Sequence, residues 1–97
     1  MANDPQNPVP QMQVRVTDDT LGGTYSNNAT IAHTREEFLL DFFSVFPPAG
    51  KLVARVIVSP SHMKRIVRVM SDSLKKYEEM YGTIPETAAP PTPQIVH

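Results

Sequence analysis

The chain has 97 residues, with ten prolines, no cysteine and a formal net charge of −1 at pH 7. A chain of this length forms one domain at most, and the lack of cysteine excludes disulfides and thiolate metal sites. The longest nearly apolar run, residues 38–49, is interrupted by Asp41 and Pro47 and is too short to cross a bilayer. Residues 1–11 show neither the basic region nor the apolar run of a signal peptide, so we expect a cytoplasmic protein without membrane partners.

Seven of the ten prolines lie at the two ends of the chain, in residues 1–10 and 85–97, where few apolar residues accompany them. We therefore expect disordered tails at residues 1–10 and 85–97, and a single domain at residues 11–84. A folding unit of this size buries only about 60% of its unfolded surface. Without disulfides, self-association is the remaining way to stabilise it.

The first half of the folding unit has the pattern of strands. Met12, Val14 and Val16 alternate with polar residues, which is the period of a half-buried strand. Residues 21–24 contain two adjacent glycines and predict a hairpin turn, and residues 25–32 predict the second strand. Residues 34–37 allow one helical turn capped by Thr34, because a glutamate follows three positions later.

The run at residues 38–46, FLLDFFSVF, is compatible with either a helix or a strand. A helix here would be apolar on nearly all sides, so we favour a short turn at residues 34–37 followed by a strand. Residues 47–50, PPAG, predict a turn, and residues 52–58 predict a β-branched strand buried on both faces.

A pair of opposite charges predicts the register of this hairpin. Placing Asp41 opposite Arg55 brings together the only two charges of these two strands and leaves neither bare. The register predicts two faces. One carries Phe38, Leu40, Phe42, Phe46, Leu52, Ala54, Val56 and Val58; the other carries Leu39, Asp41, Phe43, Val45, Val53, Arg55 and Ile57.

A long amphipathic helix is the clearest element of the sequence. Ser59 is suited to be its N-cap, Pro60 its first residue and Gly82 its C-terminal cap. Apolar residues recur at steps of three and four and form what we call the apolar stripe: Met63, Ile66, Val67, Met70, Leu74, Tyr77 and Tyr81.

These elements predict an α+β fold, an antiparallel meander of about four strands with the C-terminal helix packed on one face. One helix covers only one face of a sheet, so the other face is left too apolar for a soluble monomer. We expect that face to be a self-association interface in a dimer or higher oligomer, made by Leu39, Asp41, Phe43, Val45, Val53, Arg55 and Ile57.

No cluster of residues forms a catalytic or cofactor motif. His33 with Glu36 or Glu37 has a helical metal-ligand spacing, but no four-ligand set exists, so we expect no metal and no cofactor. Five basic residues along one edge of the helix suggest an alternative nucleic-acid contact: Lys64, Arg65, Arg68, Lys75 and Lys76. Acidic residues lie between them and no stacking aromatics are near, so a solvated helix face is favoured.

The order of several motifs resembles the family of small bacterial and archaeal proteins grouped as domain of unknown function 3467. The resemblance covers residues 25–84 and departs only at Arg35, where proline is expected, and at Met63, where alanine is usual. The residues that carry it are Asn27 or Asn28, His33-Thr34, Glu37-Phe38, Asp41-Phe42, Arg55-Val56, Ser59-Pro60, His62, Lys64-Arg65, Leu74, Tyr77-Glu78, Gly82 and Ile84.

This resemblance implies no activity and no catalytic residue. More loosely, strands followed by one long helix are similar to the subunit layout of the export chaperone SecB, at the level of fold alone. We therefore expect a non-enzymatic protein that binds itself, with another protein or an unfolded polypeptide as a further partner. The alternative is a nucleic-acid-associated protein that uses the basic helix edge.

Overall fold

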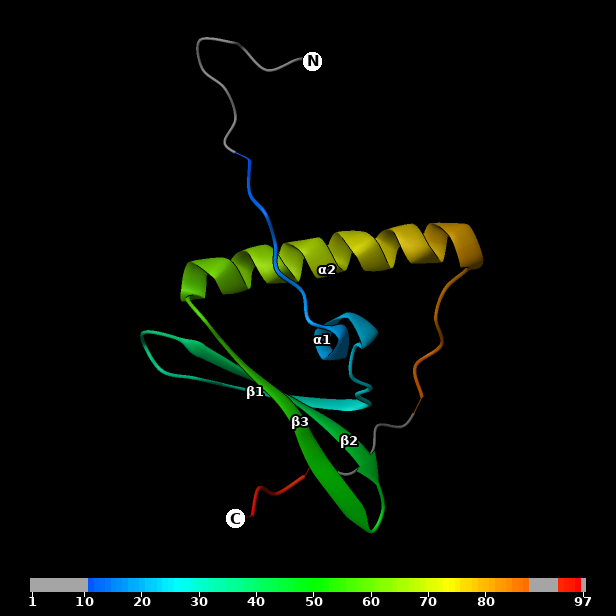
Figure 1. Cartoon of the computed structure of the whole chain (residues 1–97). Coiled ribbons are helices and arrows are strands. Elements are labelled where there is room, and N and C mark those ends of the chain that lie inside the picture. The colour runs from blue at the N-terminus through cyan, green and yellow to red at the C-terminus, as the bar shows by residue number, and fades with distance from the viewer. Residues whose placement is uncertain (1–10, 88–92, 97) are drawn as a thin grey trace, which may run out of the picture.

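The computed structural model describes residues 11–87 and 93–96 and contains two helices and three strands (Figure 1). In chain order these are α1 (Asp18–Gly22), β1 (Asn28–His33), β2 (Phe38–Phe46), β3 (Ala49–Val58) and α2 (Pro60–Tyr81). The expected α+β class, an antiparallel sheet followed by a C-terminal helix, is confirmed. Residues 1–10, 88–92 and 97, which we expected in disordered tails, lie outside the described residues.

The predicted first strand at residues 12–16 and its hairpin turn at residues 21–24 are wrong. Residues 11–17 have no regular structure, and Met12 and Val14 are 87% and 79% exposed. The chain instead forms α1, whose N-cap is Thr17: its side chain accepts a hydrogen bond from the Thr20 amide at 3.3 Å. Alternation produces a strand only where a neighbouring strand supplies hydrogen bonds, and no strand of the described residues pairs with residues 12–16.

The sheet has three strands rather than four, in the order β1-β2-β3, with both neighbouring pairs antiparallel. The favoured turn before β2 is confirmed: the Thr34 side chain accepts hydrogen bonds from the amides of Glu36 and Glu37 at 3.2 and 3.3 Å. The predicted register of β2 and β3, with Asp41 opposite Arg55, is also confirmed.

A β-bulge at Val53 changes the predicted faces near the tip of the hairpin. Phe42 pairs with Ala54 but Phe43 pairs with Leu52, so Val53 has no partner in the register. Leu52 therefore shares a face with Phe43, and its predicted place beside Phe42 and Phe46 is wrong. A bulge inserts one residue into one strand and advances the alternation there, which a strict period of two does not anticipate.

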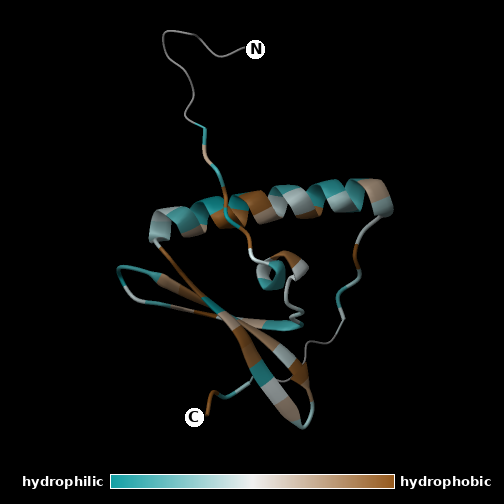
Figure 2. Cartoon of the chain, in the orientation of Figure 1, coloured by the Kyte–Doolittle hydropathy of each residue, from teal (hydrophilic) through white to brown (hydrophobic). Residues whose placement is uncertain are grey.

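The helix α2 runs from the end of β3 across one side of the sheet (Figure 1). Brown, hydrophobic segments lie on α2 as well as on the β2–β3 hairpin (Figure 2). In the part of the chain that the structure describes, the buried apolar residues are Leu40, Phe43, Val45 and Val58, and α2 contributes none.

Two described parts of the chain leave their surface uncovered. Segment 11–17 is exposed throughout, and α2 contributes no buried residue. The described residues of one copy therefore form only a small core.

Candidate functional site

Most of the apolar stripe of α2 is uncovered. Ser59 caps the helix by accepting a hydrogen bond from the His62 amide at 3.2 Å, and Gly82, with φ of 96°, ends it as predicted. Within the stripe, only Met63 and Ile66, near the start of the helix, are half-buried. The rest of the stripe is 50–69% exposed: Val67, Met70, Leu74, Tyr77 and Tyr81.

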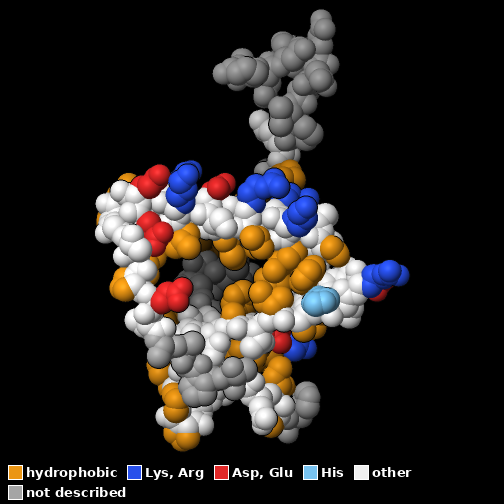
Figure 3. Space-filling view, turned by 180° about the vertical axis from the view of Figure 1, so that it is seen from behind, with side chains coloured by type: hydrophobic (Ala, Val, Ile, Leu, Met, Phe, Trp, Pro, Cys, Tyr) orange, Lys and Arg blue, Asp and Glu red, His pale blue; other side chains and the backbone are white. Residues whose placement is uncertain are grey.

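Hydrophobic side chains gather around a hollow between α2 and the sheet (Figure 3). The rings of Tyr77 and Tyr81 lie 4.9 Å apart and tilted by 51°, so they form a single aromatic end to the stripe. A helix of 22 residues with this much exposed apolar side chain is typical of an interaction surface.

The seven residues predicted as an interface do not share one environment. Asp41, Phe43 and Val45 are buried within the chain, at 7%, 3% and 8% exposed. Leu39 and Val53 are half-buried, whereas Arg55 and Ile57 are exposed. The residues of this face that a partner can contact are therefore Arg55 and Ile57, near the C-terminal end of β3.

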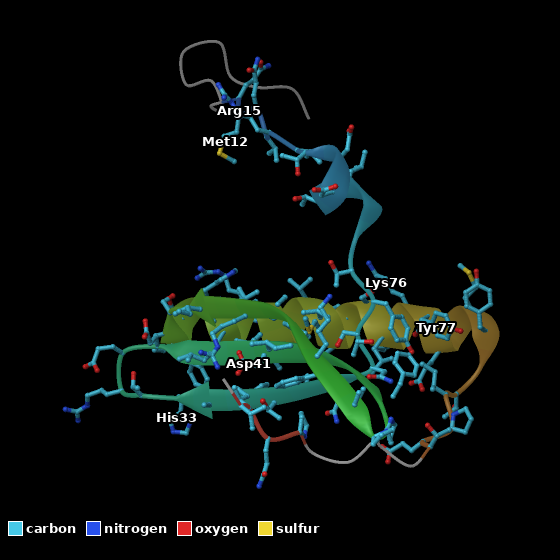
Figure 4. The ribbon with its side chains drawn as sticks, turned by 60° about the horizontal axis from the view of Figure 1, so that its bottom comes forward. Met12, Arg15, His33, Asp41, Lys76 and Tyr77 are labelled. Atoms are coloured by element: carbon cyan, nitrogen blue, oxygen red, sulfur yellow. The ribbon has the colours of Figure 1, made fainter. Side chains whose placement is uncertain are left out.

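Asp41 and Arg55 form an ion pair with two parallel hydrogen bonds. Arg55 Nε donates to Asp41 Oδ1 at 2.7 Å, and the second guanidinium nitrogen donates to Asp41 Oδ2 at 2.8 Å. The hydrogen bond from Arg55 lowers the pKa of Asp41 below its ordinary value, against the opposing effect of burial. Asp41 therefore stays ionised and paired, which is a structural role rather than that of a proton donor. Figure 4 shows Asp41 within the sheet.

The end of the β2–β3 hairpin forms a groove of about 410 Å³ together with residues 93–96. Phe43, Val45 and Leu52 line it from the sheet, and Pro47 and Pro48 line it from the connection. Ile95, which also lines the groove, is 47% exposed. We did not predict this contact, because the proline-rich end was expected to remain unpacked.

Sequence reasoning also missed Asn27. Its side chain accepts a hydrogen bond from the Val45 amide at 2.8 Å and donates one to the Val45 carbonyl at 2.9 Å. The Ser26 hydroxyl donates to the Phe43 carbonyl at 2.9 Å. An Asn near the start of the strand predicted at residues 25–32 is the available signal, because its amide can replace a backbone unit in the ladder.

The histidines and acidic residues considered for a metal do not converge. Among residues 11–87 and 93–96, no three His, Cys, Asp or Glu side chains lie close enough to hold a metal ion. His33, labelled at the edge of the sheet in Figure 4, lies against the ring of Phe38 at 5.5 Å.

The basic residues of α2 are Lys64, Arg65, Arg68, Lys75 and Lys76, and all five are exposed. Red acidic side chains lie between the blue ones along the helix in Figure 3. Neither helix of the described region has the length and hydropathy needed to span a bilayer.

A family model described as "Protein of unknown function (DUF3467)" matches residues 1–86 of the chain. This match confirms the resemblance drawn from the motifs between residues 25 and 84. No curated protein and no solved structure matches the chain. The looser likeness to the SecB subunit therefore finds no support.

Proposed function

Because this chain belongs to the DUF3467 family, whose function is unknown, we propose a function from its surfaces: it is a non-enzymatic homo-oligomer that acts through protein–protein contact. One observation carries the proposal. The described residues bury only four apolar side chains, while a 22-residue amphipathic helix buries none.

The energetics favour a second copy of the chain over an isolated monomer. The four buried apolar side chains of the described residues make a small core, and a folding unit of this size usually needs additional stabilisation. Covering the exposed half of the apolar stripe supplies further burial without any change in the fold.

The sheet supports the same proposal. β3 lies at the edge of the sheet, and its exposed residues include Leu52, Val56 and Ile57. An apolar edge strand with few charges is open to pairing or packing with another chain. A chain without cysteine needs no oxidising compartment to fold, so we place this oligomer in the cytoplasm.

Sedimentation velocity or light scattering between about 1 and 100 µM tests the proposal. We expect a dimer or larger species and a melting temperature that rises with protein concentration. Leu74→Lys, at the centre of the apolar stripe, should dissociate it. The control Val69→Lys, on the same helix but off the stripe and 66% exposed, should not. A monomer that is fully folded at 1 µM would contradict the proposal.

A further inference from the structure

Six residues of the apolar stripe repeat with a strict heptad spacing. Met63, Val67, Met70, Leu74, Tyr77 and Tyr81 follow one another at steps of four, three, four, three and four. This is the a/d pattern of a coiled coil, continued over nearly three heptads. It differs from the broader stripe of a helix that packs only on a sheet, which follows a period of 3.6.

The order of these residues suits an antiparallel partner of the same sequence. When two copies of α2 run in opposite directions about an axis at Asp72, position i faces position 144 − i of the partner. Met63 then faces the partner's Tyr81, Val67 faces the partner's Tyr77, and Met70 faces the partner's Leu74. All six layers are filled by apolar pairs, and the smallest residue, Val67, meets a tyrosine.

The charges beside the stripe agree with the same alignment. Lys64 and Glu78 each directly follow a stripe residue, Met63 and Tyr77, so they lie on the same flank of the helix pair. In this register Lys64 lies two residues, or about 3 Å along the axis, from the level of the partner's Glu78, and this pair occurs twice by symmetry. On the other flank Ile66 lies at the same offset from the partner's Met80, so that side is apolar. The two serines nearest the axis, Ser71 and Ser73, are small enough to let the helices approach closely.

A parallel arrangement lacks this agreement. It places the basic first half of α2, with Lys64, Arg65 and Arg68, beside the same three cations of the other copy. Like charges at that separation repel, and the two helix dipoles would also be aligned unfavourably.

We propose that the partner of the apolar stripe is the α2 helix of a second copy, paired antiparallel in the register that brings Val67 against the partner's Tyr77 and Lys64 near the partner's Glu78. The inference rests on the proposed homo-oligomer and specifies its contact. The half-exposed state of Val67, Met70, Leu74 and Tyr77, at 50–58%, is the surface that the second helix covers.

Disulfide trapping tests the register without background, because the chain has no cysteine. Val67→Cys and Tyr77→Cys are prepared separately, with tags of different size, and mixed under mild oxidation. In the proposed register the two positions share a layer, and the mixture forms a mixed disulfide. Neither variant alone does so, because two copies of residue 67 lie about 15 Å apart along the axis and a disulfide needs Cα atoms within about 7 Å.

A second pair, Met63→Cys with Tyr81→Cys, gives the same result independently if Tyr77→Cys impairs folding. Covalent dimers of a single variant would show a parallel pair and overturn the inference. An oligomer by sizing that traps neither mixture would also overturn it, while leaving the proposed function intact. A monomer by sizing would overturn both.

Charge reversal provides a matched comparison. Lys64→Glu should weaken dimerisation roughly tenfold, because two attractive pairs become repulsive. Adding Glu78→Lys to the same chain should restore it. Arg65→Glu, the same charge change at the neighbouring outward position, should leave the dissociation constant unchanged. Equal weakening by Lys64→Glu and Arg65→Glu, with no rescue, would contradict the pairing.

Discussion

Phe43 and Phe46 lie three residues apart on β2 and have opposite environments, which makes them a matched test of where the core lies. Phe43 is 3% exposed and Phe46 is 63% exposed, although the ring of Phe46 stacks on Tyr25 at 6.2 Å. Truncation to alanine removes the same atoms at both positions, so a difference in the loss of stability reports the difference in burial.

Phe43→Ala should lower the free energy of unfolding by about 3–5 kcal/mol, the usual cost of removing a buried phenylalanine. Phe46 keeps only a little over a third of its side chain covered, so Phe46→Ala should cost about 1 kcal/mol. For a domain of this size, 1 kcal/mol corresponds to about 4–8 °C in melting temperature. We therefore expect a decrease above about 12 °C for Phe43→Ala and below about 8 °C for Phe46→Ala.

Thermal and urea unfolding, followed by far-UV circular dichroism at one fixed protein concentration, measures both changes. Both variants should keep the far-UV spectrum of the parent chain at low temperature. Equal losses for the two variants would refute the reasoning, because burial within one chain would then not determine their contributions.

Three further predictions concern the sheet and its groove. The lowered pKa of Asp41 gives stability that is complete above its unfolded pKa of about 3.9 and is lost as the pH falls through the lower folded value. The difference in melting temperature between the parent chain and Asp41→Asn should therefore shrink below about pH 4. A difference that stays constant with pH would contradict the ion pair as its cause. Asn27→Ala removes both hydrogen bonds to Val45 and should cost about 1–3 kcal/mol in urea unfolding, whereas a change below about 0.5 kcal/mol would show that water replaces them. Deleting residues 93–97 uncovers the groove beside Val45 and should cost about 1 kcal/mol, the worth of one half-buried side chain, with an unchanged melting temperature as the contrary result.

The hairpin was the most predictable part of the fold because two constraints agreed. The two charges Asp41 and Arg55 fixed the register, and the aromatic run fixed β2 as a strand. The bulge at Val53 was not predictable, because nothing in the sequence LVAR marks an extra residue. Such a bulge depends on the twist of the paired strands, which is a property of the folded sheet.

The N-terminal error has a different physical origin. The alternation at residues 12–16 describes side chains alone, whereas a strand also needs a partner for its backbone. Thr17 followed by Asp18 and Asp19 was the better signal, since a hydroxyl cap and first-turn acids both favour a helix start.

The existence of an uncovered apolar surface was predictable, but the element that carries it was not. Counting apolar faces predicted an uncovered surface, which the structure contains. The prediction placed that surface on the sheet, because it assumed that α2 packs fully against the opposite face. Whether a helix is covered by its own sheet depends on tertiary placement, which the periodicity of its residues does not encode.

The bulge in β3 also marks where this hairpin can change length. Removing Val53 would leave Ala54 and Leu52 adjacent, each still paired as before with Phe42 and Phe43. Every other residue of the strand would keep its face of the sheet. A deletion nearer the end of the strand, at Val56 for example, would turn its neighbours over and place a charge among apolar residues. Among related chains, insertions and deletions of a single residue in this strand should therefore collect at the position of Val53.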